Sequence, residues 1–244
     1  MIIPFAPRRH FAALVLAIAG ASAVHAQTVP DPLTCLLIPA HSSDIGSDRG
    51  GIVADVPVKR ADYVQEGQVL VQLDDSLAKA DLELAQINRD ALGAKLDRST
   101  ALVDSKIISR DEIEQMRTDF AIAKAQADRA ALQVSRAQVL APYPGYISKV
   151  YVQNGELIGT QPLVQLIDIR TLKAELVFTS EAYGKIAIGD TLPIGVDLVN
   201  KVVDAKVTVV DPFLDASSNT FTITAEIDNA DQALPAGASC RIAQ

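Results

Sequence analysis

One short β-motif occurs twice, and residues 76–137 between the two copies contain no proline and a single glycine. The tetrapeptide Leu-Val-Gln-Leu at residues 70–73 returns unchanged at residues 163–166. Alternating apolar side chains, with corner glycines at Gly67 and Gly155, predict a strand, a turn and a strand in each copy. One such unit cannot bury its apolar face alone, so we expect the two copies to pair with each other.

The intervening block predicts two helices that fold back on each other. Apolar residues recur at alternating steps of three and four, the repeat of a coiled coil, on two stretches joined by a short loop. We expect an antiparallel hairpin over residues 76–139, ended by Pro142 and Pro144. At about 1.5 Å per residue each helix would be roughly 40 Å long, so the hairpin would project as an arm. The predicted seam comprises Leu77, Ala80, Leu84, Ile87, Ala91, Ala94, Arg98 and Ala101 on the first helix, and Ile113, Met116, Phe120, Ala123, Ala127, Ala130, Val134 and Ala137 on the second.

The last third of the chain predicts a small antiparallel barrel. Short alternating stretches recur there, with turn signals between them. The predicted fold class is therefore α+β: a β-sandwich in two halves, interrupted by the helical hairpin and followed by the barrel. The predicted barrel strands are 172–178, 191–198, 205–210, 220–227 and 238–242.

The first 26 residues have the features of a secretory signal peptide. Arg8 and Arg9 precede an apolar stretch, and small residues lead to a cleavage site after Ala26. No later segment reaches the roughly 18 apolar residues that a membrane span needs. Cleavage would leave 20 basic and 30 acidic side chains, a formal charge of −10. Nucleic acid and anionic lipid surfaces are therefore poor candidate partners.

A β-sandwich split by a helical hairpin and followed by a β-barrel resembles the periplasmic adaptor subunits, or membrane fusion proteins, of tripartite efflux pumps, especially pumps with RND-type transporters. The split sandwich resembles a lipoyl or biotinyl domain. The resemblance implies a lipoyl-like sandwich built from residues 43–75 and 140–168 and a barrel built from residues 169–244. The segment 27–42 is expected to join the barrel.

The resemblance also implies a function and a set of partners. It implies a periplasmic adaptor, held at the inner membrane by its transporter, that joins an inner-membrane exporter to a TolC-type outer-membrane channel. Copies of the adaptor would stand side by side in a ring, as a trimer or a hexamer. Only residues 27–42 are left over for the family's membrane-proximal domain, so the barrel or another subunit is expected to contact the transporter. An ABC-type exporter is the alternative partner.

Three residues at the expected tip of the arm match the Arg-Leu-Ser motif of adaptors that dock onto TolC-type channels: Arg98, Leu102 and Ser109. Local structure alone would explain Ser109 and Leu102, but it does not explain Arg98. Ser109 followed by Glu112 forms a capping box, which would make Ser109 the N-cap of the second helix. Leu102 would pack across the end of the hairpin. Arg98 occupies a predicted seam position, where a buried guanidinium would be costly, so we expect it to lean out toward a partner.

The sequence allows two interpretations of Cys35 and Cys240. In the family the two ends of the chain meet in the barrel, so the resemblance implies a disulfide between them in an oxidising compartment. Two small buried thiols are the other interpretation, because sequence spacing alone does not bring the Cα atoms close enough for a bond. We predict the disulfide in protein purified from the periplasm.

Catalytic and cofactor chemistry finds little support in the sequence. His41 is the only histidine after the signal peptide, and Met116 is the only methionine, so neither a histidine-based site nor a methionine-rich metal site can be assembled. A lipoyl or biotinyl carrier domain would be an alternative function. Lys79 is the nearest match to the modified lysine of such a domain, but it falls in the first helical turn, where a solvated lysine is the ordinary interpretation. We therefore expect no catalytic residue, no cofactor and no metal site.

Overall fold

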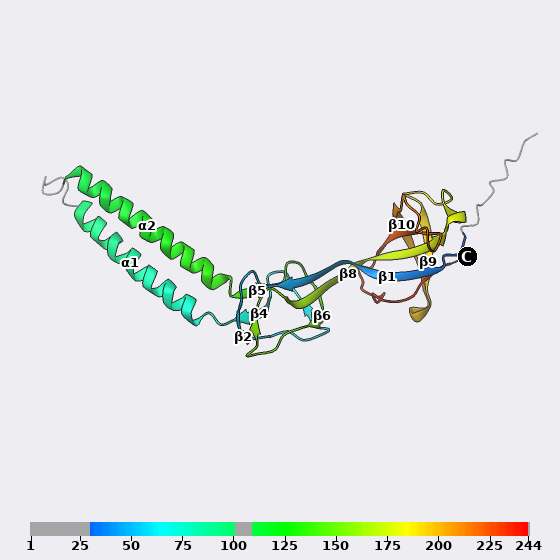
Figure 1. Cartoon of the computed structure of the whole chain (residues 1–244), viewed down its shortest axis with the longest axis horizontal. Coiled ribbons are helices and arrows are strands. Elements are labelled where there is room, and N and C mark those ends of the chain that lie inside the picture. Colours follow the sequence, from blue (N-terminus) through cyan, green and yellow to red (C-terminus); the bar gives the residue numbers. More distant parts are fainter. Residues whose placement is uncertain (1–29, 101–108, 244) are drawn as a thin grey trace, which may run out of the picture.

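The computed structural model describes residues 30–100 and 109–243, so the predicted signal peptide and the tip residue Leu102 lie outside the described residues. Two β-regions and a helical hairpin follow one another along a single long axis (Figure 1). The elements are β1 (Thr34–Gly46), β2 (Gly51–Asp55), β3 (Tyr63–Val64), β4 (Val69–Leu73), α1 (Ser76–Thr100), α2 (Arg110–Ser135), β5 (Gln138–Leu140), β6 (Gly145–Val150), β7 (Leu157–Ile158), β8 (Pro162–Thr179), β9 (Thr191–Val196), β10 (Lys201–Val210), β11 (Thr220–Asp228) and β12 (Arg241–Ile242), with short 3-10 turns at Ser180–Ala182 and Asp197–Val199.

The two motif copies pair with each other, as predicted. β2 pairs with β7, where Gly51 lies opposite Ile158, and β3 pairs with β6, where Tyr63 lies opposite Tyr146. The remaining partners of this region form the sheet order β5-β4-β2-β7. The sandwich encloses its own apolar core, with fully buried members from both copies: Val53, Val64, Leu70, Leu73, Ile147, Leu163 and Leu166. The helices α1 and α2 are inserted between β4 and β5, which confirms the α+β fold class.

Two long strands run through both the sandwich and the barrel. β1 pairs with β8 in antiparallel register, and the pairing shifts between Pro39 and His41. On one side of this bulge β8 contributes to the sandwich, and on the other side it pairs with β11 in the barrel. The stretches 163–166 and 172–178, which the sequence pattern separates, therefore belong to one continuous strand.

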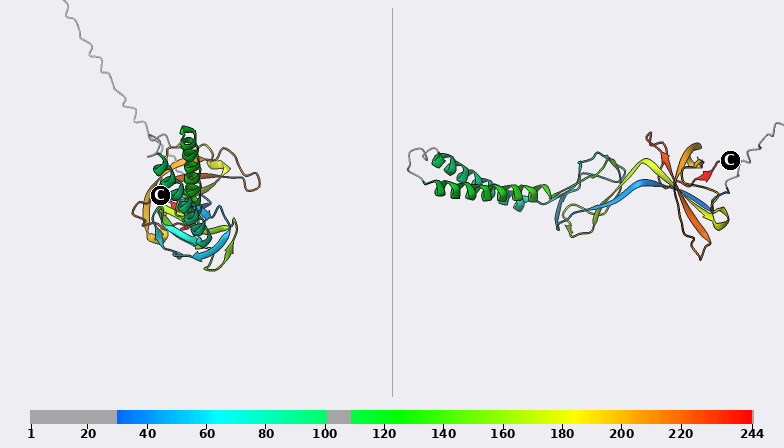
Figure 2. Two further views of the ribbon diagram at one scale, coloured as in Figure 1. Left: turned by 90° about the vertical axis from the view of Figure 1, so that its left-hand side faces the viewer. Right: turned by 90° about the horizontal axis from the view of Figure 1, so that it is seen from above.

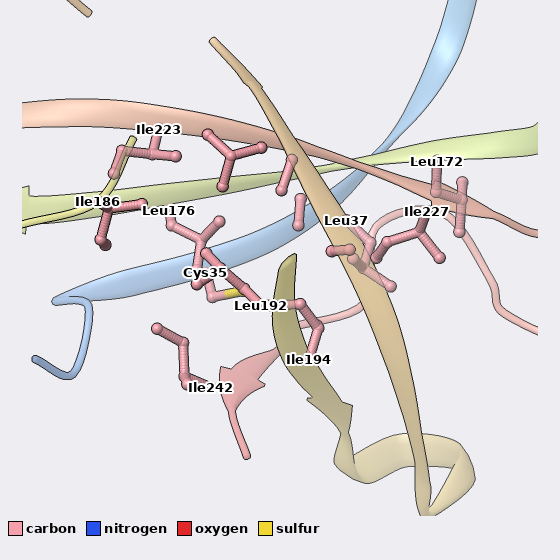
Figure 3. Packing of buried hydrophobic residues seen from close by; sticks show 14 of the residues in the cluster. Cys35, Leu37, Leu172, Leu176, Ile186, Leu192, Ile194, Ile223, Ile227 and Ile242 are labelled. Atoms are coloured by element: carbon pink, nitrogen blue, oxygen red, sulfur yellow. The ribbon is translucent and has the colours of Figure 1, made fainter. Parts of the chain in front are cut away.

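The barrel has a second, separate core. Its sheet continues from β8 through β11, β10 and β9 to β12, and alternate residues of each strand point inward. Figure 3 shows this packing, with apolar side chains from β1, β8, β9 and β11 meeting in one cluster. The last strand is shorter than the predicted 238–242 and spans only Arg241–Ile242.

A set of polar contacts occupies the neck between sandwich and barrel. Asp168 is a buried residue, only 7% exposed, and its carboxylate accepts hydrogen bonds from the Arg170 guanidinium, with Nη2 and Oδ2 2.6 Å apart. These bonds hold the pKa of Asp168 below its usual range. The Tyr146 hydroxyl of the sandwich lies 2.7 Å from Gln232 Oε1 in a barrel loop, to which it donates. The two β-regions are thus joined by side chains as well as by β1 and β8.

Candidate functional site

The helical hairpin extends from the sandwich on the side away from the barrel, so most of its length is open to a partner (Figure 1). Its two helices contact each other along their length, and no other helix or strand of the described residues lies beside them (Figures 1 and 2). Among the described residues, no helix is long and apolar enough to cross a membrane. No three His, Cys, Asp or Glu side chains of the described residues lie close enough together to hold a metal ion.

The predicted seam of α2 is confirmed. Ile113, Ala123, Ala127 and Ala130 are buried, and the seam positions between them are half-buried. Alanine at three of these four positions lets the two helices approach closely, because a methyl group leaves room for the facing backbone.

The predicted seam of α1 is wrong, because the residues that face α2 lie one or two positions later in the sequence. Leu77, Leu84 and Ile87 are 75%, 68% and 60% exposed, so they lie on the outer face of the hairpin. A second series at the same alternating spacing faces α2 instead, and its members are buried or half-buried: Ala78, Leu82, Ala85, Arg89, Leu92, Leu96 and Ser99. The sequence contains both series, and apolar spacing alone does not choose between them.

The contact between Gly93 and Phe120 shows which series faces the partner helix. A Cβ atom placed on Gly93 would lie 2.9 Å from Phe120 Cε2, closer than carbon atoms normally approach. The aromatic ring therefore fills the space that the missing side chain leaves. The arm has one glycine and one phenylalanine, and pairing them across the hairpin would have indicated from the sequence which face of α1 contacts α2.

Two of the three tip residues lie within the described residues. Arg98 is exposed in the last turn of α1, and it is not a seam residue, because Ser99 occupies that position. A cation there is favourable next to the negative end of the helix dipole. Ser109 is the N-cap of α2, as the capping box predicts: its Oγ accepts a hydrogen bond of 3.1 Å from the Glu112 amide. Whether either residue contacts a channel stays a prediction.

Polar contacts at the base of the arm, which the sequence did not reveal, tie the hairpin to the sandwich. The segment between β1 and β2 reaches the last turn of α2, where Arg49 Nη1 donates to the Gln133 carbonyl oxygen at 2.9 Å. The neighbouring Asp48 carboxylate pairs with Arg136 at 3.5 Å. At the start of α1, the Asp74 carboxylate accepts the Ser76 amide at 2.9 Å, which lowers the pKa of Asp74. The arm is thus bonded to the sandwich through both helices.

Lys79, the nearest match to the modified lysine of a carrier domain, lies in the first turns of α1. Its Nζ pairs with the Asp75 carboxylate at 3.0 Å, one helical turn away. The lysine is therefore placed on a helix rather than at the tip of a short β-hairpin, where a carrier domain presents it.

The structure joins Cys35 and Cys240 by a disulfide. Their Cα atoms are 4.9 Å apart, and the Cys240 amide also donates to the Cys35 carbonyl oxygen at 3.0 Å. Cys35 lies in β1, and Cys240 directly precedes β12, so the bond connects the two ends of the described chain within the barrel. That the two cysteines are bonded in protein purified from the periplasm stays a prediction.

Comparison with known proteins identifies relatives of this chain by sequence. No protein-family model matches the chain. The chain is 26% identical over 261 residues to the membrane fusion protein MtrC of Neisseria gonorrhoeae, a match that covers 92% of this chain and 62% of MtrC. It is 25% identical over 201 residues to an uncharacterized protein of Haemophilus influenzae, covering 81% and 52% of the two chains. It thus spans about half to three fifths of the length of these relatives.

Solved structures share the fold. A MacA-MexA chimera that contains the Pseudomonas aeruginosa MexA α-hairpin superposes with a TM-score of 0.76 at 19% identity, over 87% of this chain and 78% of the chimera. The membrane fusion protein Spr0693 of Streptococcus pneumoniae gives 0.69 at 17% identity, over 87% of this chain and all of that structure. These likenesses concern the fold: a hairpin inserted into a split sandwich, with a barrel beyond it. The chain is therefore similar in sequence to a membrane fusion protein and shares the fold of solved membrane fusion proteins.

Proposed function

We propose that this protein is a periplasmic adaptor that bridges an inner-membrane exporter and an outer-membrane channel for the export of small molecules. The observation that carries the proposal is the placement of the hairpin, which projects from the sandwich at the end opposite the barrel (Figure 1). A relative of Pseudomonas putida, 28% identical over 137 residues, carries the name antibiotic efflux pump periplasmic linker protein, which supports the same role. Copies of the chain would stand side by side in a ring around the export path.

The mechanism would be mechanical rather than chemical. The hairpin tip would engage the periplasmic end of the channel, and the barrel would face the exporter. An RND-type exporter is the proposed partner, and an ABC-type exporter is the alternative. Affinity purification of the tagged chain after cross-linking in cells, followed by identification of the bound transporter, separates the two.

Arg98 tests the tip contact. Replacing Arg98 by Asp reverses the charge that the tip offers to a channel and introduces repulsion or an unpaired charge at the joint. The arm should stay folded, because a single exposed charge contributes little to stability. We expect unchanged helicity by circular dichroism and a loss of efflux, measured as increased drug or detergent susceptibility of cells that carry the cognate pump.

Lys59→Asp, the same change of charge in an exposed turn of the sandwich, is the matched control and should leave efflux intact. Full efflux by a folded Arg98→Asp variant would show that the tip contact does not depend on this residue. A carrier function makes a different prediction: the intact mass of the mature protein would include a lipoyl or biotinyl group, which we do not expect to find.

A further inference from the structure

The turn before β7 carries the dipeptide Asn154-Gly155, the one Asn-Gly pair in the chain. Asparagine is a chemically labile residue, because the nitrogen of the next residue can attack its side-chain amide carbon and displace ammonia. A following glycine has no side chain to hinder this attack. Four other asparagines, each followed by a larger residue, lie in the chain: Asn88, Asn200, Asn219 and Asn229. Asn154 is therefore the asparagine with the least steric protection from its own sequence.

The shape of the turn does not require this dipeptide. The first motif copy has the corresponding turn with Arg60-Ala61 in the place of Asn154-Gly155. In each copy the amide of the fourth turn residue donates to the carbonyl oxygen of the first, at 3.1 Å and 3.2 Å. Ala61 adopts a φ of 73°, and Gly155 adopts a φ of 84°. The reactive pair is thus a chemical feature of the second copy alone.

The folded backbone keeps the Gly155 nitrogen away from the Asn154 amide carbon. The positive φ of Gly155 after the negative φ of Asn154 makes the turn type II, in which the residue at the position of Asn154 has a ψ of about +120°. Ring closure needs the Asn154 Cβ and the Gly155 nitrogen to eclipse each other across the Cα–C bond, which this ψ does not allow. The Gly155 amide also donates to the Val53 carbonyl oxygen of β2 at 2.8 Å.

A side-chain contact restrains the Asn154 amide as well. Its Nδ2 donates to Oδ1 of Asp55, the last residue of β2, at 3.2 Å. An amide that rotates freely reaches the reactive arrangement more often than one that is bonded. The closed turn therefore restrains both reacting groups, the nitrogen of Gly155 and the side chain of Asn154, and each is bonded to β2.

Both restraints depend on the pairing of β7 with β2, which is short. β7 is two residues long and lies at the end of the sheet order β5-β4-β2-β7. Its register partners are Gly51 and Ile52, and Leu157, which is 75% exposed, adds little burial. Short edge segments with few buried contacts open more readily than a core. Opening at this edge frees the Gly155 nitrogen and the Asn154 side chain together.

The reaction of the open turn needs only water as a co-reactant. The Gly155 nitrogen bonds to Asn154 Cγ, the Cγ–Nδ2 bond breaks, and ammonia leaves with the proton of the Gly155 amide. The product is a cyclic imide. Water then cleaves one of its two C–N bonds: cleavage at Cγ gives aspartate, and cleavage at the main-chain carbonyl carbon gives isoaspartate, whose backbone runs through Cγ.

Either product disfavours closing of the edge. Aspartate at position 154 replaces the donor that faces Asp55 with a second negative charge, which repels it. Isoaspartate also carries a carboxylate, and it lengthens the backbone between Gln153 and Gly155, so the Gly155 amide loses its match with the Val53 carbonyl oxygen. The change is permanent, because ammonia has left.

We propose that Asn154 is a modification site: the closed pairing of β7 with β2 suppresses its spontaneous deamidation, opening of that edge allows it, and the product then holds the edge open. The inference concerns the chemistry of the chain itself and does not depend on the proposed exporter or channel.

Mass spectrometry of the purified full-length mature protein tests the site. The protein is incubated in mildly alkaline buffer, digested at acidic pH, and the fragment that contains Asn154 is analysed. In urea, Asn154 should convert before the other four asparagines. In the folded protein its conversion should be at least about tenfold slower, because only molecules with an open edge react. Equal rates in the two conditions, or earlier conversion of another asparagine in urea, would overturn the proposal.

Asp55 tests the side-chain restraint. Asp55→Ala removes the acceptor of the Asn154 amide and should speed conversion in the folded protein severalfold. Asp44→Ala is the matched control, since the Asp44 carboxylate also accepts a side-chain hydrogen bond in the sandwich, from Tyr151, and it should leave the rate unchanged. Circular dichroism confirms that both variants are folded. Equal rates in the two variants would exclude Asp55 from the protection of Asn154.

Asn154→Asp reproduces one product and tests its effect on the edge. Hydrogen exchange of residues 153–158 should be faster in this variant than in Asn154→Ala, which loses the same donor without adding a charge. Adding Asp55→Asn to the Asn154→Asp variant removes the repulsion and should restore slow exchange. Equal exchange in the Asp and Ala variants would overturn the inference that the product holds the edge open.

Discussion

At the scale of single residues, Gly93 has a packing role rather than a conformational one. Its backbone is helical, so no special dihedral angle demands glycine there. Glycine in a helix interior is less favourable than alanine by roughly 1 kcal/mol, which makes its presence informative. The Phe120 ring against its Cα accounts for it.

Replacing Gly93 by Leu should lower the melting temperature of the helical signal. The new side chain occupies the space of the Phe120 ring, and overpacking of this kind typically costs about 1–3 kcal/mol. Combining Gly93→Leu with Phe120→Ala makes room and should recover part of the loss, as followed by circular dichroism at 222 nm. If both variants melt like the parent protein, the two residues do not pack against each other.

Asp215 predicts a pH dependence in the barrel. Its carboxylate accepts hydrogen bonds from the Ser217 amide, the Ser217 hydroxyl and the Ser218 amide, which lower its pKa to about 2. A depressed folded-state pKa contributes stability that is present above the unfolded pKa of about 3.9 and is lost as the pH falls through about 2. Asp215→Asn should therefore melt below the parent protein at pH 6, and the gap should narrow at pH 2. A gap that stays constant over this range would contradict the shift.

At the scale of elements, α2 was predictable from the sequence and the orientation of α1 was not. The predicted seam positions of α2 are all apolar, whereas the other faces of that helix carry charged side chains. In α1, the series that contains Leu82 and Leu92 and the series that contains Leu84 and Ile87 are both apolar, and only contact with the partner helix distinguishes them. Arg98 was assigned to the seam for the same reason.

The start of α2 allows capping and channel contact to be separated at Ser109. Replacing Ser109 by Ala removes the acceptor for the Glu112 amide and should cost about 1 kcal/mol of helix stability. Ser109→Asp keeps an N-cap acceptor and should keep the helix stable in thermal melts. Normal efflux by the Asp variant would assign Ser109 to capping alone, whereas efflux lost in both variants would indicate a contact of the hydroxyl with the channel.

At the scale of the whole molecule, the order of the structural regions followed from the repeated motif, which only closes into a sandwich if its copies pair. The continuity of β8 did not follow, because Asp168 and Arg170 interrupt its apolar pattern and suggest an end of the strand. Their mutual hydrogen bonds satisfy the buried carboxylate, so the strand continues through the neck. The base of the arm was also missed, since Arg49 reaches Gln133 across 84 positions in sequence.

The disulfide predicts how the ends of the chain behave. Protein purified from the periplasm without reductant should show no free thiols in quantitative labelling. Replacing Cys35 and Cys240 by Ser should lower the free energy of unfolding by about 2–5 kcal/mol, measured by urea denaturation. Two free thiols per chain would show that the cysteines are reduced in the native protein.

The neck formed by β1 and β8 has a mechanical consequence. A strand already rises about 3.3 Å per residue, close to the greatest length that a polypeptide backbone can span. A pull along the long axis therefore meets two nearly taut backbones, and stretching them would require distorted bond angles. Twisting or bending at the shift between Pro39 and His41 meets much less resistance, since strand pairing is already interrupted there. The neck should therefore transmit tension between barrel and arm without lengthening, while it allows the two ends to turn relative to each other.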